Sequence, residues 1–164
     1  MKKLEKEILA ILKSNARAAI EDIAKMVNST VTEVSQILER LEKTGAIVQY
    51  TAVINEKHLS YLGNKVRALI ELRIRPEKKT GFDRIAKRIA GFPQVVDHYL
   101  ISGNYDFLII VEGETLEEIS RFVSEKLASI ENVNGTATHF IMKKYKERGV
   151  VIEDLPQDRL LVSP

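Results

Sequence analysis

The stretch from Asn28 to Tyr50 combines a strong helical period with side chains that can contact nucleic acid. Thr30 followed by Glu33 forms a capping box, in which the hydroxyl and the carboxylate each satisfy a backbone N–H of the first helical turn. Gly45 ends the predicted helix. Apolar residues recur between these signals at helical spacing and form one stripe: Val31, Val34, Ile37, Leu38 and Leu41.

The helix also carries hydrogen-bonding side chains suited to base edges and phosphates. These candidate DNA contacts are Thr30, Thr32, Ser35, Gln36 and Arg40, with Lys43 as a phosphate anchor. We therefore predict the recognition helix of a helix-turn-helix. A three-helix bundle without a ligand is the alternative that the residue pattern leaves open.

Composition excludes several protein classes. The 164 residues are 45% hydrophobic and 29% charged, and the absence of cysteine excludes disulfides, thiolate catalysis and Cys-based zinc sites. No apolar run approaches the roughly 18 residues needed to span a bilayer, and a signal-peptide core is lacking. We expect a cytoplasmic protein without a membrane partner. His58, His98 and His139 have no metal-ligand spacing, so we predict neither metal nor cofactor, and no catalytic residues.

The elements around the candidate recognition helix complete a small N-terminal domain. Helices are predicted over residues 2–14 and 20–27, and Asn28 with Ser29 forms the turn before the third helix. Residues 46–50 are predicted as a short strand. We assign 1–50 to a winged-helix-like DNA-binding domain and 51–63 to a hinge strand and connector.

From Lys65 onward the period changes to two, and strands alternate with helices. Strands are predicted over 65–75, 95–101, 105–112 and 136–145, and helices over 80–91 and 115–130, with turns at 102–104 and 132–135. This order is that of a ferredoxin-like βαββαβ domain, assigned to 64–146, so the fold class is α+β.

The strand around Phe107 to Val111 is apolar on both faces, whereas a helix layer covers only one face of a sheet. We therefore predict a homodimer in which a second copy covers the other face. A loop or the tail covering that face is the alternative. The tail, residues 147–164, is too apolar for a disordered end, and we expect it to dock on the sheet or on a partner subunit.

The arrangement of these elements resembles the Lrp/AsnC family of feast/famine transcriptional regulators. Two motifs carry the resemblance, ILERLEKTGAIVQYTAVIN from Ile37 to Asn55 and SGNYDFLIIVEG from Ser102 to Gly113, and the similarity covers residues 1–146. It implies a C-terminal RAM (ACT-like) domain and a dimer that assembles to an octamer or another higher oligomer. It also implies binding to double-stranded, palindromic promoter sites and a response to an amino acid or related small molecule.

In that family, the equivalent of Gly103 to Asp106 is a G-x-x-D turn that lines the effector site. Backbone N–H groups at such a turn can receive a carboxylate, and Asp106 can pair with an amino group. The candidate effector residues are Ser102, Gly103, Asn104, Asp106, Thr136 and Thr138, the two threonines being contributed at the subunit interface. The alternative is a turn-stabilising role for Asp106 and a strand-forming role for the threonines.

Two further functions compete with the regulator. Asp97-His98-Tyr99 resembles a His-containing strand of siroheme decarboxylases, but the chain has no Trp and lacks their Trp-Pro-Tyr segment. The acidic residues Glu33, Glu39 and Glu42 on the recognition helix motivate a ligand-sensing assembly protein without DNA binding. We expect a regulator and not an enzyme.

Overall fold

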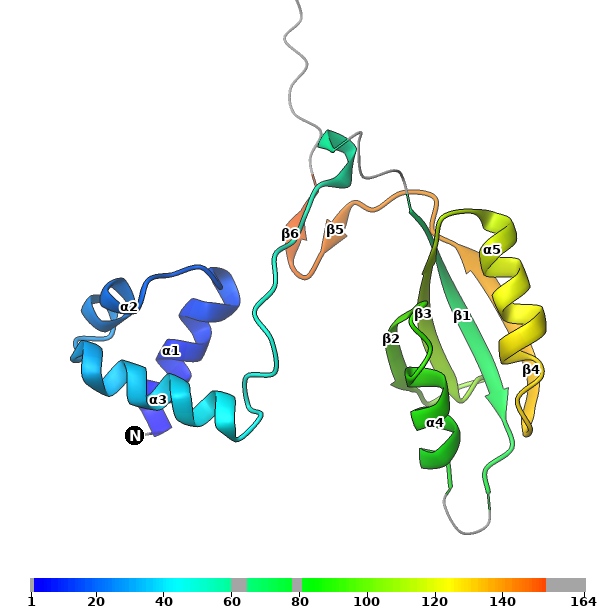
Figure 1. The fold of residues 1–164 in the computed structure, drawn as a ribbon, viewed down its shortest axis with the longest axis horizontal. Helices are drawn as coiled ribbons and strands as arrows, with labels where there is room; N and C mark the ends of the chain where they lie inside the picture. Colours follow the sequence, from blue (N-terminus) through cyan, green and yellow to red (C-terminus); the bar gives the residue numbers. More distant parts are fainter. Residues whose placement is uncertain (1, 60–64, 78–80, 153–164) are drawn as a thin grey trace, which may run out of the picture. The chain divides into compact units, whose positions relative to one another are not determined.

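A computed structural model describes residues 2–59, 65–77 and 81–152 of the chain. The chain divides into two compact units, Met1–Ile54 and Asn55–Pro164 (Figure 1). The division falls inside residues 51–63, the segment that the sequence assigns to the connector. Each unit has its own hydrophobic core and is described by itself.

The N-terminal unit consists of three helices, α1 (Lys2–Ser14), α2 (Ile20–Met26) and α3 (Val31–Lys43). Between α2 and α3, Asn28 adopts a left-handed conformation with φ 51°, which asparagine tolerates well. The three predicted helices and the turn are confirmed. Their buried core is Ile8, Ile23, Ala24, Val34, Ile37, Leu38 and Leu41.

Both ends of α3 follow the sequence signals. The Thr30 hydroxyl accepts the Glu33 N–H at 3.1 Å, and Gly45 follows the helix with φ 71°. One half of the predicted capping box is different: the Glu33 carboxylate accepts the Ser29 hydroxyl at 2.6 Å, not the backbone N–H of Thr30. Ser29 therefore adds a side-chain link across the turn.

The strand predicted from Ala46 onward is wrong. Residues 46–54 have no strand pairing, although they are rich in β-branched and aromatic side chains. A strand requires hydrogen bonds to a neighbouring strand, and the described part of this chain supplies none here. The Ile47 N–H instead donates to the Leu41 carbonyl at 3.0 Å, and Val48 is 91% exposed.

The C-terminal unit is built on a four-stranded antiparallel sheet with strand order β2-β3-β1-β4. This order and the alternation with helices confirm the ferredoxin-like fold. Its elements are η1 (Glu56–His58), β1 (Val66–Ile74), α4 (Asp83–Ala90), β2 (Val95–Leu100), β3 (Phe107–Gly113), α5 (Leu116–Arg121), the π-helical segment η3 (Phe122–Leu127) and β4 (Val133–Phe140).

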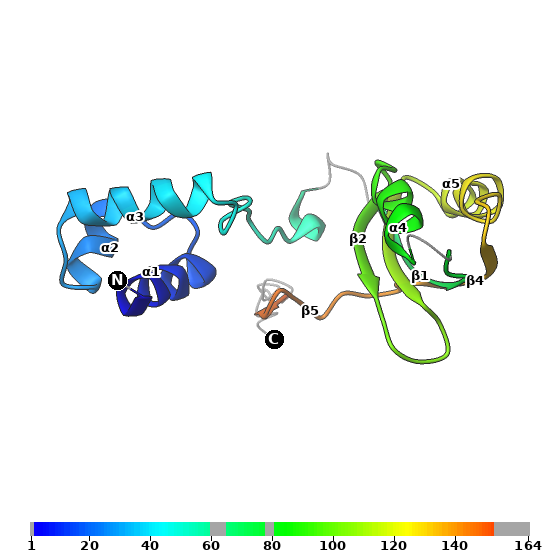
Figure 2. The same cartoon turned by 90° about the horizontal axis from the view of Figure 1, so that it is seen from below.

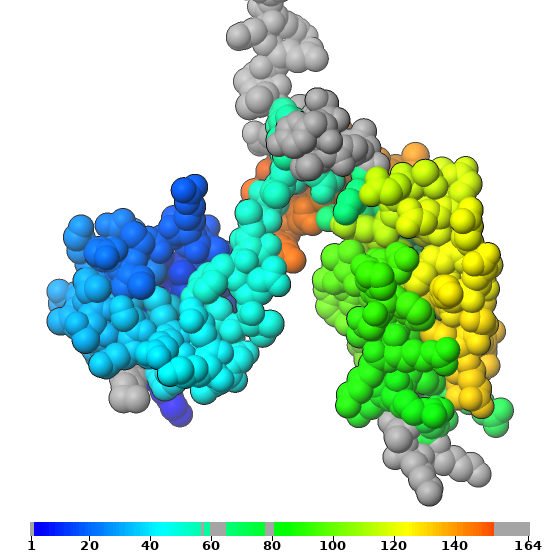
Figure 3. All heavy atoms as spheres, in the orientation of Figure 1, coloured from blue at the N-terminus to red at the C-terminus, as the bar shows by residue number. Residues whose placement is uncertain are grey.

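Helices α4 and α5 lie on the same side of the sheet (Figure 2), and they form much of the face of this unit that Figure 3 shows, in green and yellow. Ile85 and Ile89 of α4 and Ile119 of α5 join the core formed by alternate residues of β1 and β3. The strand register places the intervening residues on the opposite side. We call this side the helix-free face; it carries Arg67, Leu69, Glu71, Arg73, Asp97, Tyr99, Leu108, Ile110, Glu112, Ala137 and His139.

Several predicted boundaries in this unit are wrong. Strand β3 begins at Phe107 and not at Tyr105, and the helix predicted over 115–130 ends at Leu127. Helix α4 begins at Asp83, three residues after the predicted start; Thr80 itself lies outside the described residues. The predicted turn at 132–135 is shorter, because β4 begins at Val133 and pairs with Ile74 across an irregularity in the register. The same strand ends at Phe140 and not at Tyr145.

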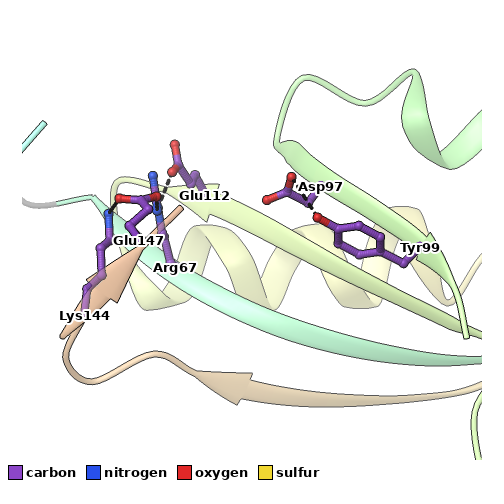
Figure 4. A network of polar contacts seen from close by, with 6 residues as sticks. All are labelled: Arg67, Asp97, Tyr99, Glu112, Lys144 and Glu147. Carbon is purple, nitrogen blue, oxygen red and sulfur yellow. Dashed lines mark hydrogen bonds and ion pairs between the residues drawn. The ribbon is translucent and has the colours of Figure 1, made fainter. Parts of the chain in front are cut away.

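The first part of the tail forms a two-stranded hairpin, β5 (Lys146–Glu147) and β6 (Val150–Val151). An ionic network attaches it to the sheet (Figure 4): Arg67 is paired with Glu112 and, at 2.7 Å, with Glu147, which also accepts Lys144 at 2.7 Å. Glu147 thus contacts the sheet, whereas Val150 and Val151, two of the apolar tail residues on which the expected docking rests, are 50% and 58% exposed. Residues 153–164 lie outside the described residues.

Candidate functional site

The exposed side of α3 contains the predicted DNA contacts. The apolar stripe faces the core, except that Val31 is 43% exposed. Thr32, Gln36 and Lys43 are exposed on the side opposite Val34 and Leu41. Ser35 is half-buried at the border of this surface, and Thr30 lies at the N-terminus of the helix as its cap.

Two of the predicted contacts are ion-paired within the unit. The Arg40 guanidinium lies 2.6 Å from the carboxylate of Glu5 on α1, and the Lys43 ammonium lies 2.6 Å from that of Glu39. Exposed pairs of this kind contribute at most about 1 kcal/mol. Each cation also keeps further N–H donors besides those that hold its carboxylate, and these can reach a phosphate.

The segment after α3 is attached to the helix. The Tyr50 hydroxyl donates to the Glu42 carboxylate at 2.7 Å. Burial, together with the hydrogen bond and the negative charge of Glu42, raises the pKa of Tyr50 to about 12. This contact is not among the sequence predictions. Glu42 and Tyr50 are eight residues apart, on either side of the helix end at Gly45, and that proximity was the available signal.

The predicted effector turn joins β2 to β3. Ser102, Gly103 and Asn104 are exposed, and Gly103 has φ 148°, outside the range that other residues favour. Nothing lies within 4 Å of the position that a Cβ of Gly103 would occupy. The backbone of this turn is therefore accessible to a small ligand.

Asp106 holds the turn to the sheet. Its carboxylate accepts the Ile74 N–H at 2.7 Å, and its own N–H donates to the Leu72 carbonyl at 3.0 Å. The alternative role stated for Asp106, that of an acceptor stabilising the turn, is thus present in the structure. A carboxylate has a second oxygen and several lone pairs, so this role leaves acceptor capacity for a ligand.

One neighbour of this turn was missed by sequence reasoning. The guanidinium carbon of Arg73 lies 5.2 Å from the centre of the Tyr105 ring, a cation–π contact that adds a positive charge beside the turn. The alternation of charged and apolar residues along β1 predicted which face of the sheet Arg73 points to, but not its contact with Tyr105.

Thr136 and Thr138 lie on the helix-covered side of β4. Thr136 is paired with Leu72 and Thr138 with Ile70, both of which are core residues, and paired residues point to the same face. The two threonines therefore do not project from the helix-free face, where the sequence places the dimer contact. Ala137 and His139 occupy that face of β4.

The residues of β2 that resemble a decarboxylase strand point to opposite faces of the sheet: His98 points to the helix-covered side, and Asp97 and Tyr99 point to the helix-free face. The His98 ring packs edge-on against the Phe107 ring, with 4.6 Å between the ring centres. Tyr99 is exposed, and its hydroxyl donates to the Asp97 carboxylate at 3.3 Å (Figure 4). Burial lowers the pKa of His98, against a hydrogen bond to the backbone of Ala86 that raises it. Within residues 2–59, 65–77 and 81–152, no three His, Asp or Glu side chains gather where they could hold a metal ion.

Comparison with known families assigns both units. Residues 1–48 match the winged helix-turn-helix DNA-binding family, and residues 67–151 match the Lrp/AsnC ligand binding domain. The second match covers more than half of the chain. The chain belongs to the Lrp/AsnC family. It is a transcriptional regulator of this type, with a helix-turn-helix DNA-binding unit and a ligand-binding unit.

Relatives and solved structures agree with this assignment. The chain is 43% identical over 162 residues to the uncharacterized HTH-type transcriptional regulator YugG of Bacillus subtilis, covering 98% of this chain and 96% of the relative. An AsnC family transcriptional regulator from Agrobacterium tumefaciens aligns with a TM-score of 0.71 at 26% identity, over 98% of this chain and 100% of that one.

A third comparison concerns the fold alone. The transcriptional regulator NMB0573 of Neisseria meningitidis, solved as an L-Met complex, aligns with a TM-score of 0.70 at 24% identity, over 92% of this chain and 96% of that one.

Membership of the Lrp/AsnC family points to a DNA-binding regulator and away from an enzyme. Among the helices described, none is long and apolar enough to cross a membrane.

Proposed function

We propose that this Lrp/AsnC regulator binds palindromic promoter DNA as a homodimer through α3 and changes its DNA binding when an amino acid occupies the turn from Ser102 to Asp106. The observation that carries the proposal is the division of α3 into a buried apolar side and an exposed polar side. The proposed base contacts are Thr30, Thr32, Ser35, Gln36 and Arg40, with Lys43 on phosphate.

The effector part rests on the accessible backbone around Gly103 and on the remaining acceptor capacity of Asp106. These groups complement the carboxylate and the ammonium of an amino acid. The shared fold with a regulator crystallised with L-Met agrees with this ligand class. Roles of Thr136 and Thr138 in effector binding stay a prediction.

The dimer rests on the helix-free face. Leu69, Leu108 and Ile110 are only partly exposed there, and charged residues of both signs surround them. A face that carries both signs can be complementary to itself about a two-fold axis, and a two-fold dimer explains a palindromic operator. We include in the proposal a higher assembly, such as an octamer, and a cytoplasmic location.

Selection of bound genomic fragments, with and without a mixed amino-acid pool, tests DNA binding and effector response. We expect a palindromic site whose affinity falls steeply with salt and changes with the pool. The variant Q36A/R40A should lose this preference, whereas Q94A/R121A, the same exchange on the C-terminal unit, should keep it. Protein without sequence preference at low salt would contradict the proposal.

Sedimentation tests the dimer. Replacing Leu108 by Asp places a charge in the centre of the helix-free face and should yield monomers, because burying an unpaired charge is very unfavourable. Ser120→Asp, on the exposed side of α5, is the matched control and should remain dimeric. A dimeric L108D protein would exclude this face as the interface.

A further inference from the structure

The three acidic side chains of α3 have different partners. Glu33 accepts the Ser29 hydroxyl at the N-terminus of the helix, and Glu42 accepts the Tyr50 hydroxyl at the start of the connecting segment. Only Glu39 is paired with a neighbour on the exposed side, since Lys43 donates to it at 2.6 Å. All three carboxylates are exposed, but among them Glu39 is the one whose partner, Lys43, lies on the side of α3 opposite the buried stripe.

That position lies in the middle of the exposed surface. Thr32, Gln36, Glu39 and Lys43 follow one another at steps of four, three and four residues, which places them in one row along an α-helix. Glu39 and Lys43 keep 63% and 73% of their side-chain area exposed. Arg40 lies beside this row, where Glu5 of α1 holds its guanidinium.

We propose that Glu39 reads a base: its carboxylate accepts the N4 amino group of a cytosine in the operator major groove. The proposal rests on the proposed entry of α3 into that groove. A carboxylate only accepts hydrogen bonds, and cytosine presents a donor there, whereas guanine presents two acceptors and thymine an acceptor and a methyl group. Adenine offers a donor beside an acceptor and is the weaker match.

Lys43 makes this reading compatible with the charge of DNA. The hydrogen bond and positive charge of Lys43 lower the pKa of Glu39, so the carboxylate stays ionised at neutral pH. The pair as a unit carries no net charge, so it is not repelled by phosphates as a single carboxylate would be. One ammonium occupies one acceptor position and leaves others for the base.

Gln36 provides the expected neighbouring contact. It lies three residues before Glu39, about 4.5 Å along the helix axis, compared with about 3.4 Å between successive base pairs. A glutamine amide pairs with the N7 and N6 positions of adenine. An operator half-site should therefore contain an adenine and a cytosine at adjacent or nearly adjacent positions.

Fragment selection with the full-length protein and the variant E39Q tests the inference. The wild type should require cytosine at one position of each half-site. In E39Q the preference for cytosine over the other bases at that position should fall by about 5- to 150-fold in relative affinity, and the relative affinity for adenine there should rise. Preferences at the other positions should not change. E39Q removes only an exposed ion pair, and its thermal unfolding should confirm that it folds.

Two further variants isolate the base contact. E42Q makes the same chemical change on the same helix but outside the exposed row, so it should select the wild-type sequence. K43A should bind all sequences more weakly while keeping the cytosine preference. An unchanged preference in E39Q, or the same change in E42Q, overturns the inference while leaving the regulator itself intact. A wild type with no sequence preference overturns both.

Discussion

Asp106 is the residue in which a structural role and an effector role can be separated experimentally. Its carboxylate accepts the N–H of Ile74, a residue only 4% exposed at the end of β1. Replacing Asp106 by Ala leaves this donor without a partner, which costs about 1–3 kcal/mol. In a unit of this size, each kcal/mol corresponds to a fall in Tm of about 4–8 °C.

Replacing Asp106 by Asn keeps an acceptor oxygen and removes the charge. Because a hydrogen bond to a charged group is stronger than a neutral one, we expect D106N to lose about 1 kcal/mol, less than D106A. The amide cannot attract an ammonium group, so D106N should also lose the response of operator binding to a mixed amino-acid pool.

Thermal unfolding, hydrogen exchange at the Ile74 amide and operator-binding titrations with and without the pool measure these effects. D83N is the matched control, since Asp83 is an exposed residue at the start of α4, on the helix-covered side of the sheet and not on the proposed dimer face. A D106A protein with wild-type Tm and a protected Ile74 amide would refute the structural reasoning. A D106N protein that answers the pool normally would refute the effector role.

Three further predictions concern contacts of the two units. Burial raises the pKa of Glu147, but the hydrogen bonds and charges of Lys144 and Arg67 outweigh it and lower the pKa. The network therefore stabilises the fold above the unfolded pKa near 4.5, and this contribution is lost as pH falls through the lowered folded value. The difference in Tm between wild type and E147Q should vanish at low pH, and a difference that persists would contradict the network. Because the pKa of Tyr50 is raised from 10 to about 12, its contribution to stability is present below pH 10 and is lost as pH rises through 12. The Y50F protein should lack both this loss and the phenol that titrates at about 12 in an ultraviolet titration. The mutation T30A should destabilise the N-terminal unit by about 0.5–2 kcal/mol in denaturant unfolding, since it removes the cap of α3, and T32A on the exposed side should have little effect.

The local elements were determined by the sequence itself. The spacing of Val34, Ile37, Leu38 and Leu41 is a property of neighbouring residues, and so is the alternation from Val66 to Ile74; the structure confirms both as buried faces. The cap at Thr30 involves residues three positions apart, within one helical turn. Periodic burial and capping act over short distances, which explains why these signals were sufficient.

Pairings between distant residues were decided only by the tertiary structure. Arg40 contacts Glu5 and Asp106 contacts Ile74, separations of 35 and 32 residues that no local pattern encodes. Residues 46–54 have strand propensity but no strand pairing, because a strand depends on its neighbour. The register of β4 against β1 decides which face of the sheet Thr136 and Thr138 point to. A shift of this register by one residue would turn both side chains to the opposite face.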